Sequence, residues 1–599
     1  MPLDHAPVVI IDHLSPRQSA APRRRTRLPP CPVGKFHDSR TLLRQALLQE
    51  KGMTQTSGKR PLKWQNYHET VERTAPDLRD LATVSSGNLA AWLAASTAAA
   101  QALLTEAAAA GTMVQVLGGT WSFSRLLSGN GILADPKLVN VDDLPIFGLT
   151  SADTANPRVL VGGGVRIGQL NAWLEARQLS LFTSGAHDGQ TVAGACATST
   201  HGSVLGYGAF QNHVRAIQLV TGPQESVWLE PQEDRGARVD DALLAGVARR
   251  MPDDELFAAA LVHLGGLGIV NALVLEVSPA YSVAVVRRRQ LWDEGLSRLL
   301  QDGQYAAFAA QVWPDAIAQF GKQPPYYIEV ILHPFRNVVQ NLPPPFNKPR
   351  PALISLYWQG AAPADEEDAR WFDDTLNLLE RFVRHRPSEL PGDLFDRIAQ
   401  SLADTLPVPW AVGDAVGAMF RQTPDAGDRP RRATWGKANG PHQKLPIDLF
   451  NAAYAIPRAQ LDRALDVIHR AFLADGIGGA APVVFTLRFV QGAAGLLAFQ
   501  RFPETVVINM DGLRSTACFQ AAARIALALE MADIPFSQHW GKQGEITASR
   551  VAREYDGGND GNPLGQDRAQ RWRAARARLL AAPMHDILTN DSLQDWQLG

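Results

Sequence analysis

The feature that most constrains this chain is a run of small and hydroxyl-bearing residues from 185 to 204, which ends in His201-Gly202-Ser203-Val204. Side chains this small let main-chain N–H groups approach a ligand closely, so the run favours a pyrophosphate site. A turn between two strands would need only two or three small residues. The candidate ligand-binding residues of the run are Gly185, Thr191, Gly194, Thr198, His201 and Gly202.

Two more glycine-rich loops precede this run. An apolar stretch at residues 113–117 leads into a loop whose candidate binding residues are Gly118, Gly119, Thr120, Trp121 and Ser122. A second apolar stretch leads into Gly163 and its two neighbouring glycines, before an amphipathic helix that contains Leu170. The order of strand, glycine turn and hydroxyl groups suits phosphate binding by main-chain amides. Neither loop has the spacing of a Rossmann fingerprint or of a P-loop, so we expect neither of those folds.

In this order and spacing, the three loops resemble the FAD-binding domain of the vanillyl-alcohol oxidase / p-cresol methylhydroxylase (PCMH) flavoprotein family. A later segment, Leu264–Val270, is similar to a family turn that holds the adenine side of FAD, which implies binding roles for Gly268 and Ile269. His539-Trp540-Gly541-Lys542 resembles the His-Trp-x-Lys signature of the branch of sugar-lactone (D-arabinono-1,4-lactone, L-gulonolactone) and alditol oxidases. There is also some likeness to type II cholesterol oxidase.

The resemblance implies an α+β fold, with a two-part FAD-binding domain of the PCMH type and an inserted α+β substrate-binding cap domain. We expect a leader without fixed structure at residues 1–60, because this segment is rich in Pro, Arg and Ser. The FAD-binding domain is expected at 61–280, the cap at 281–500, and a segment returning to the FAD domain at 501–599. In the cap, apolar patterns predict strands at 326–332, 353–358, 483–490 and 504–510, and helices at 371–383 and 461–472.

Composition excludes several other classes of protein. The formal net charge of −2 gives no broad electrostatic case for nucleic acid. The three cysteines are too few and too scattered for a disulfide framework or a zinc site, and they fit a reducing cytoplasm. The alanine-rich stretch Leu89–Ala110 carries Gln101, Glu106 and other polar residues, so it predicts a surface helix and not a membrane span. We therefore expect a cytoplasmic protein without a metal site.

Oxidation of an alcohol by a flavin needs positive charge near the flavin N1 and a base for the hydroxyl proton. By its place in the motif, Lys542 is the first candidate for the charge, and Arg488 matches the arginine of the branch's Glu-x-Arg strand. The glutamate position is Thr486 here, which puts a lactone or alditol substrate in doubt; Glu329 could supply the carboxylate instead. His539 is a candidate base, or equally a structural residue that holds the Lys542 loop.

Two further residues bear on the cofactor. Trp121 stands where many family members have a histidine that bonds covalently to FAD, so we expect FAD to be bound non-covalently. Aligned on the family turn, Gly163 lies beside the flavin C4a, and without a Cβ it leaves the path to this atom open. We therefore expect O₂ as the electron acceptor and H₂O₂ as a product.

The expected function is an FAD-linked oxidase that transfers hydride from a CH–OH group of a small or medium-sized alcohol or lactone to flavin N5. An alternative is a tailoring oxidase or dehydrogenase of a larger apolar metabolite or sterol. The Thr486 change and the cap's aromatic residues favour it modestly; these are Tyr326, Tyr327, Tyr357 and Trp358. A third possibility is a flavin-binding protein with a degenerate active site.

Overall fold

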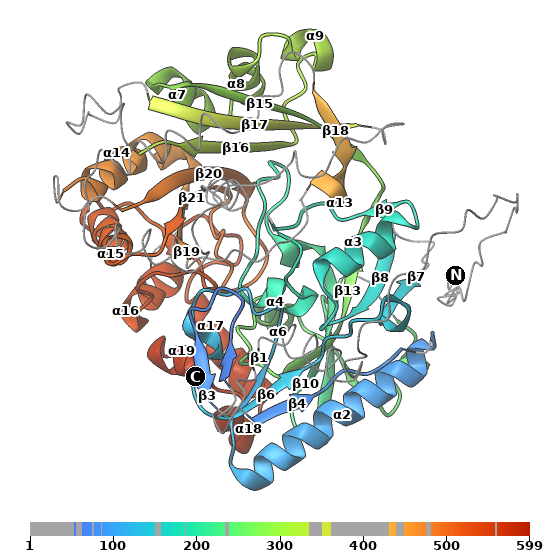
Figure 1. Cartoon of the computed structure of the whole chain (residues 1–599). Coiled ribbons are helices and arrows are strands. Elements are labelled where there is room, and N and C mark those ends of the chain that lie inside the picture. Colours follow the sequence, from blue (N-terminus) through green and yellow to red (C-terminus); the bar gives the residue numbers. More distant parts are fainter. Residues whose placement is uncertain are drawn as a thin grey trace, which may run out of the picture.

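In the computed structural model, the described residues are 53–54, 63–74, 77–85, 87–149, 157–185, 187–233, 239–334, 350–360, 430–438, 449–474, 481–557 and 560–599. The expected leader lies outside them apart from Met53–Thr54, and so does the helix predicted at 371–383. Figure 1 shows two units, one above the other, each built on a large sheet. Both units mix helices and strands, as the α+β prediction requires.

The lower unit is built on a six-stranded sheet. Its strands are β7 (Ile146–Leu149), β8 (Arg158–Gly162), β10 (Val214–Val220), β11 (Ser226–Glu230), β12 (Arg249–Pro252) and β13 (Ile269–Glu276). Their order across the sheet is β12-β11-β10-β13-β8-β7, and only β11 and β12 run parallel. Gly162 lies opposite Ala272, so the glycine turn after β8 lies against the start of β13.

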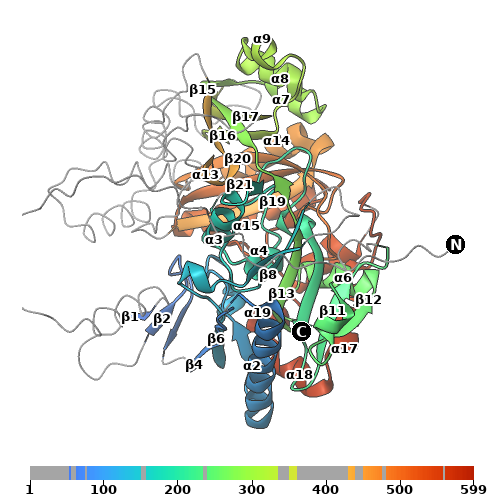
Figure 2. The same cartoon turned by 90° about the vertical axis from the view of Figure 1, so that its right-hand side faces the viewer.

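A long helix, α2 (Leu89–Ala110), packs on this sheet and leads into the first glycine loop, as the sequence predicts. The Asn88 side chain caps its first turn, and Gly111 ends it in the left-handed conformation at φ +60. The chain then continues through β5 (Val114–Val116), which pairs in parallel with β6 (Ile132–Asp135). Figure 2 shows α2 at the base of the lower unit. None of the described helices combines the length and apolar character that crossing a bilayer requires.

Short elements complete the lower unit. Its remaining strands are β1 (Met53–Thr54), β2 (Lys63–Gln65), β3 (Glu72–Thr74), β4 (Asp77–Asp80), β9 (Leu179–Ser180) and β14 (Ser278–Pro279). Its remaining helices before the second sheet are α3 (Ile167–Glu175), α4 (Val192–Ala197), α5 (Asp241–Leu244) and α6 (Asp254–Leu261). Strand β4 joins β5 and β6 in one parallel sheet, which places the loop after β5 at the sheet's end.

The upper unit is built on an eight-stranded sheet. Its strands are β15 (Ser282–Trp292), β16 (Tyr327–Leu332), β17 (Arg350–Gly360), β18 (Arg431–Thr434), β19 (Leu449–Pro457), β20 (Val483–Gln491), β21 (Glu504–Leu513) and β22 (Ser537–Gln538). Their order is β18-β15-β17-β16-β20-β21-β19-β22, so the four strands predicted from the sequence are β16, β17, β20 and β21. The boundary expected at residue 501 falls between two neighbouring strands of this sheet, and the chain leaves the sheet only after β22.

The central strands of this sheet have one apolar face and one polar face, because successive residues of a strand point to opposite sides. On β20, Phe485, Leu487 and Phe489 belong to the core beneath the helices, whereas Thr486 and Arg488 alternate with them. The helices of the unit are α7 (Glu294–Gln301), α8 (Tyr305–Val312), α9 (Ala316–Phe320), α13 (Trp435–Ala438), α14 (Leu461–Phe472) and α15 (Thr516–Met531). The polar face is therefore turned away from the helix-covered core.

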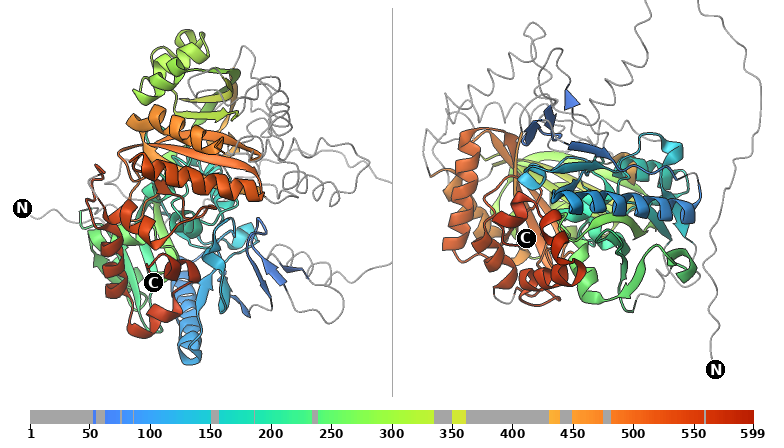
Figure 3. Two further views of the ribbon diagram at one scale, coloured as in Figure 1. Left: turned by 90° about the vertical axis from the view of Figure 1, so that its left-hand side faces the viewer. Right: turned by 90° about the horizontal axis from the view of Figure 1, so that it is seen from below.

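After β22 the chain returns to the lower unit, where its last helices pack into that unit's core. These are α16 (Ala548–Val551), α17 (Arg568–Leu579), α18 (Ala582–Ile587) and α19 (Asp591–Asp595). Figure 3 shows them, in red, beside the green strands and α2. The Trp572 indole N–H donates to the Val262 carbonyl at 3.1 Å, and the Arg576 Nε–H donates to the Gly266 carbonyl at 2.9 Å. The C-terminal segment thus holds the turn before β13 in place.

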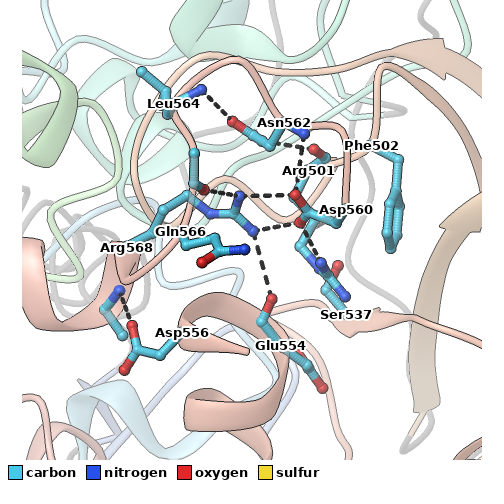
Figure 4. A network of polar contacts seen from close by, with 12 residues as sticks. Arg501, Phe502, Ser537, Glu554, Asp556, Asp560, Asn562, Leu564, Gln566 and Arg568 are labelled. Carbon is cyan, nitrogen blue, oxygen red and sulfur yellow. Dashed lines mark hydrogen bonds and ion pairs between the residues drawn. The ribbon is translucent and has the colours of Figure 1, made fainter. Parts of the chain in front are cut away.

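A buried charge network fixes the segment that follows β22 (Figure 4). Both Arg501 and Arg568 form ion pairs with Asp560, and the Asn562 amide donates to the Arg501 carbonyl at 2.6 Å. In the same network, Glu554 accepts a hydrogen bond from the Gln538 N–H at 3.2 Å. Because Gln538 directly precedes the His-Trp-Gly-Lys motif, this network sets the position from which the motif enters the space between the units.

Candidate active site

The two units meet around one cavity of about 230 Å³ that gathers most of the predicted site residues. Those that line it are Gly118, Gly119, Thr120, Trp121, Ser122, Gly163, Gly185, Thr191, Gly194, Thr198, His201, Gly268, Arg488, His539 and Lys542. Gly202 and Ile269 are not among the lining residues. A Cβ on Gly202 would lie 2.7 Å from the Ser184 carbonyl oxygen, so this glycine serves close backbone packing.

The loop after β5 offers main-chain donors to the cavity. Within the described chain, the N–H groups of Gly118, Gly119, Thr120 and Ser122 have no hydrogen-bond acceptor. Thr120 adopts φ +61, an uncommon conformation for a β-branched residue that tends to occur at functional sites. All four residues line the cavity, so this row of donors is placed to bind an acceptor such as a phosphate.

The Trp121 ring, in this loop, packs against other aromatic rings. Its ring stacks on Tyr67 with centroids 4.2 Å apart and on His187 with centroids 4.9 Å apart. A Cβ on Gly189 would lie 2.4 Å from the indole nitrogen, so only glycine lets the ring lie this close. His68 and His187 also line the cavity, and the sequence analysis did not single them out.

The central loop, residues 191–203, is held tightly on both sides. The Thr191 hydroxyl accepts from the Gly194 N–H at 3.2 Å, which begins α4. Ser199, buried at φ +60, donates its hydroxyl to Gln500 at 2.8 Å. The Ser203 hydroxyl donates to the Ile328 carbonyl and accepts from the Phe489 N–H at 2.7 Å. Ser203 thus ties the lower unit to β16 and β20.

The glycine run after β8 also packs against protein backbone. A Cβ on Gly163 would lie 2.4 Å from the Val270 carbonyl oxygen, and one on Gly164 would lie 2.4 Å from the Pro136 carbonyl oxygen. Gly163 lines the cavity, but its missing side chain would point at β13. A glycine is therefore required at position 163 because the turn after β8 lies close to β13, whether or not this position also affects the access of O₂.

A histidine that the sequence analysis did not single out joins two of the loops. His263 lines the cavity, donates from Nε2 to the Ala193 carbonyl at 3.1 Å, and accepts at Nδ1 from the Gly265 N–H at 3.1 Å. Burial lowers the pKa of His263 to about 4, so its ring is neutral at physiological pH. Through these two hydrogen bonds the neutral ring connects α4 with the turn before β13. His263 and Ala193 are 70 residues apart in the chain, so no local sequence pattern indicates this contact.

The His-Trp-Gly-Lys motif docks onto the first loop through Gly541. The Gly541 carbonyl accepts from the Phe123 N–H at 2.8 Å and from the Ser122 hydroxyl at 3.2 Å. The Trp540 indole donates to the Leu497 carbonyl at 2.8 Å. These bonds anchor the motif and leave Lys542 at the cavity, where its Nζ donates to the Asn509 side-chain oxygen at 2.8 Å.

The two site histidines near Lys542 are neutral and differ in tautomer. Burial lowers the pKa of His539 well below its ordinary value, and the charge of Lys542 lowers it further. Its Nδ1 accepts from the Gly541 N–H at 3.0 Å, so the ring proton sits on Nε2. Burial, with Lys542 and Arg488, likewise lowers the pKa of His201, whose Nδ1 donates to the Gly202 carbonyl at 2.9 Å. His539 is thus arranged as a hydrogen-bond donor to the cavity, which argues against its role as the base.

Arg488 carries a buried charge that a carboxylate balances from the neighbouring strand. Arg488 and Glu329 lie opposite each other on β20 and β16, and Nη2 and Nε of Arg488 lie 2.8 and 3.0 Å from Glu329 Oε2. Glu329 is buried and does not line the cavity, so it does not supply the carboxylate that the sequence predicts for the substrate. Its place is behind Arg488.

The carboxylate at the cavity is Asp511, which the sequence analysis did not single out. Asp511 lies on β21, is 2% exposed and lines the cavity. The Thr486 hydroxyl donates to its Oδ2 at 2.8 Å, and the Asn451 amide donates to its Oδ1 at 2.7 Å. A sequence signal existed, because Asn509 and Asp511 are polar alternations in an otherwise apolar strand. The sequence pattern does not show that β21 pairs with β20, and this pairing is what brings Asp511 to the cavity.

The comparisons with known proteins identify the cofactor. Residues 89–229 match a family described as an FAD binding domain. An alditol oxidase from Streptomyces sp. is 26% identical over 430 residues, which cover 71% of this chain and 81% of that protein. A D-arabinono-1,4-lactone oxidase from Yarrowia lipolytica is 29% identical over 185 residues, which cover 31% of each protein. A cholesterol oxidase from Brevibacterium sterolicum has a TM-score of 0.58 at 14% identity, covering 89% of this chain and 96% of that one.

These findings confirm the FAD-binding domain, the FAD cofactor and the resemblance to FAD-linked oxidoreductases stated from the sequence. The likeness to cholesterol oxidase concerns the fold alone. The cavity fits FAD, because the loop after β5 supplies the unpaired main-chain donors that a pyrophosphate accepts. Among the described residues, no group of three or more His, Cys, Asp or Glu side chains could hold a metal ion.

Proposed function

We propose that this chain is an FAD-dependent oxidase that removes a hydride and the hydroxyl proton from a CH–OH group of a small hydroxylated molecule, leaving a carbonyl group, and passes both electrons and both hydrogens to O₂, giving H₂O₂. The observation that carries the proposal is one cavity that joins the FAD-binding loops to four polar residues of the eight-stranded sheet and to Lys542 from the loop after β22. This polar set is Arg488, Asn451, Asn509, Asp511 and Lys542. The names of the relatives, an alditol oxidase and a lactone oxidase, support the same reaction class.

In this proposal the eight-stranded sheet with its helices is the substrate-binding cap, inserted in a two-part FAD-binding domain. The FAD loops are those at 118–122, 191–201 and 264–268, and FAD, when bound, supplies the hydride acceptor. Lys542 and Arg488 provide the positive charge that stabilises a developing negative charge on the substrate oxygen. Because the Nδ1 of His539 accepts from the Gly541 N–H, its Nε2–H is the proton that it can offer to a group bound in the cavity.

The polar set favours a polar substrate over the larger apolar molecule considered from the sequence. A buried carboxylate and two buried amides cost free energy when an apolar ligand covers them without hydrogen bonds. The cap's aromatic residues, which in the sequence favour an apolar substrate, do not line the cavity; these are Tyr326, Tyr327, Tyr357 and Trp358. Trp358, for example, stacks on Phe320 with ring centroids 4.5 Å apart. The oxidase reaction itself rests on the resemblance, because Gly163 packs against β13.

The test is steady-state peroxide production in air from a panel of polyols, aldonolactones, simple alcohols and a sterol. We expect activity with polyols or lactones and its loss by about 10²–10³-fold in Lys542→Met, the typical cost of one electrostatic donor. Lys437→Met, which removes a lysine from α13 outside the cavity lining, is the matched control. Turnover of the sterol alone would favour the apolar alternative. A yellow protein that oxidises nothing in the panel would contradict the proposal.

A further inference from the structure

We infer that Asp511 is the residue that selects the substrate, by accepting a hydrogen bond from a hydroxyl group next to the one that is oxidised. This inference rests on the proposed function and deepens it. It assigns to β21 the carboxylate that the sequence analysis looked for on β20, where Thr486 stands.

The first support is the inventory of charges at the cavity. Among the described residues that line it, Asp511 is the one carboxylate, whereas Arg488 and Lys542 are cations. A substrate hydroxyl can donate only to an acceptor, and an ionised carboxylate is an acceptor at both oxygens. Within the described lining, Asp511 is therefore the strongest hydrogen-bond acceptor that a polyhydroxylated molecule could meet.

The second support is the way Asp511 is held. Thr486 and Asn451 each donate to a different carboxylate oxygen, at 2.8 and 2.7 Å, from the strands on either side of β21. Each carboxylate oxygen has more than one acceptor site, so these bonds orient the group and leave it able to accept more. A fixed rotamer is what a specificity-determining residue needs.

The third support is the register of the strands. Thr486 lies opposite Asn509, and Asp511 is two residues further along the same face of β21. That face also carries Asn509, which accepts a hydrogen bond from Lys542, so the carboxylate and the residue that binds the cation lie on one strand surface. The hydroxyl at position 486 and the carboxylate at 511 thus form one unit, in which Thr486 is the positioning residue.

This arrangement predicts the substrate class. A molecule with a hydroxyl beside the reacting carbon can donate a further hydrogen bond to Asp511, whereas a mono-alcohol of the same length cannot make this bond. A hydrogen bond to a charged group contributes about 1.5–3 kcal/mol, which corresponds to a factor of about 10–150 in kcat/KM. The preferred substrates are therefore open-chain or cyclic compounds with neighbouring hydroxyl groups.

The experiment compares sorbitol with 1-hexanol, which have equal carbon chains, as substrates of wild type, Asp511→Asn, Thr486→Val and Glu504→Gln. We expect wild type to prefer sorbitol, Asp511→Asn to lose about 10–150-fold in kcat/KM for sorbitol alone, and Thr486→Val to lose less. Glu504→Gln removes a carboxylate from the exposed start of the same strand and should behave as wild type. An unchanged preference in Asp511→Asn, or an equal loss for both alcohols, would overturn the inference.

Two further measurements keep the outcomes distinct. If Asp511→Asn fails to fold, the exchanged variant Thr486→Glu/Asp511→Thr, which keeps one carboxylate on the same face, should prefer sorbitol; a variant that folds without this preference contradicts the inference. If wild type oxidises neither these two alcohols nor any compound of the panel described above, the proposed function fails, and equilibrium dialysis with labelled sorbitol then tests Asp511 directly. Sorbitol binding that wild type shows and Asp511→Asn lacks would support the inference, and no binding to wild type would overturn it.

Discussion

The pair of Arg488 and Glu329 offers a quantitative test of which charges serve the fold and which serve the reaction. Both side chains are nearly buried, at 7% and 5% exposed, and a single carboxylate oxygen receives both contacts from the guanidinium. Removing one partner of such a pair leaves an uncompensated buried charge, which costs about 3–5 kcal/mol of stability. Removing both charges together also removes both desolvation penalties, so the double variant regains most of that loss.

We therefore predict that Glu329→Gln and Arg488→Met each lower the urea midpoint of the holoenzyme strongly, and that the double variant recovers most of it. The effect on turnover should depend on which of the two residues is replaced. Glu329→Gln keeps the cavity-lining guanidinium and part of the activity, whereas both variants that lack Arg488 lose about 10²–10³-fold in kcat. Denaturation followed by fluorescence and steady-state kinetics on the same preparations measure both effects.

The outcome that refutes this reasoning is a double variant with wild-type turnover. Arg488 would then be a structural partner of Glu329 without a role at the substrate. Additive losses of stability in the double variant would instead show that the two side chains do not interact energetically.

The remaining predictions concern packing, pH and the cofactor. Gly163→Ala should lower the thermal midpoint and weaken FAD retention, because its methyl would meet a strand carbonyl at 2.4 Å; Gly148→Ala, whose methyl would meet its nearest atom at 3.9 Å, should be neutral. A stable Gly163→Ala variant with altered O₂ reactivity would instead support the prediction that Gly163 keeps the path of O₂ to the flavin C4a open. Burial raises the pKa of Glu554 from 4.5 to about 8, so the fold holds a proton that the unfolded chain releases, and stability falls as pH rises through this window. Glu554→Gln should therefore gain thermal midpoint relative to wild type from pH 5 to 8, and a constant difference would contradict the assigned pKa. Acid precipitation should release FAD into the supernatant, since Trp121 cannot bond to it; a coloured pellet would mean attachment through another residue.

The sequence predicts the parts of the site that depend on local backbone chemistry. The glycine loops at 118–122 and 191–201 line the cavity as expected, because small residues and hydroxyls are needed wherever main-chain groups face a ligand. The motif at 539–542 also brings Lys542 to the cavity, because Gly541 is hydrogen-bonded to the loop at 122–123. The motif around Gly163 predicts a role beside the flavin. The packing of this glycine instead depends on β13, which is distant in the sequence and so is not part of that motif.

What the sequence did not reveal depends on strand pairing. Glu329 and Arg488 are 159 residues apart, and only their opposite places on β16 and β20 make them an ion pair. Asp511 is a site residue because the register of β20 and β21 places it beside Thr486. Its polar face was visible in the sequence, but alternation alone cannot say which neighbour a side chain will meet.

The most direct test of the central claim is a two-step absorbance experiment on the purified holoenzyme. Under anaerobic conditions, mixing with sorbitol should bleach the visible absorbance of the oxidised flavin, and air should then restore it with one H₂O₂ formed for each flavin reoxidised. A flavin that no hydroxylated compound bleaches, although dithionite reduces it, would contradict an alcohol-oxidising site. A flavin that sorbitol bleaches but air does not reoxidise would contradict the oxidase assignment and indicate a dehydrogenase.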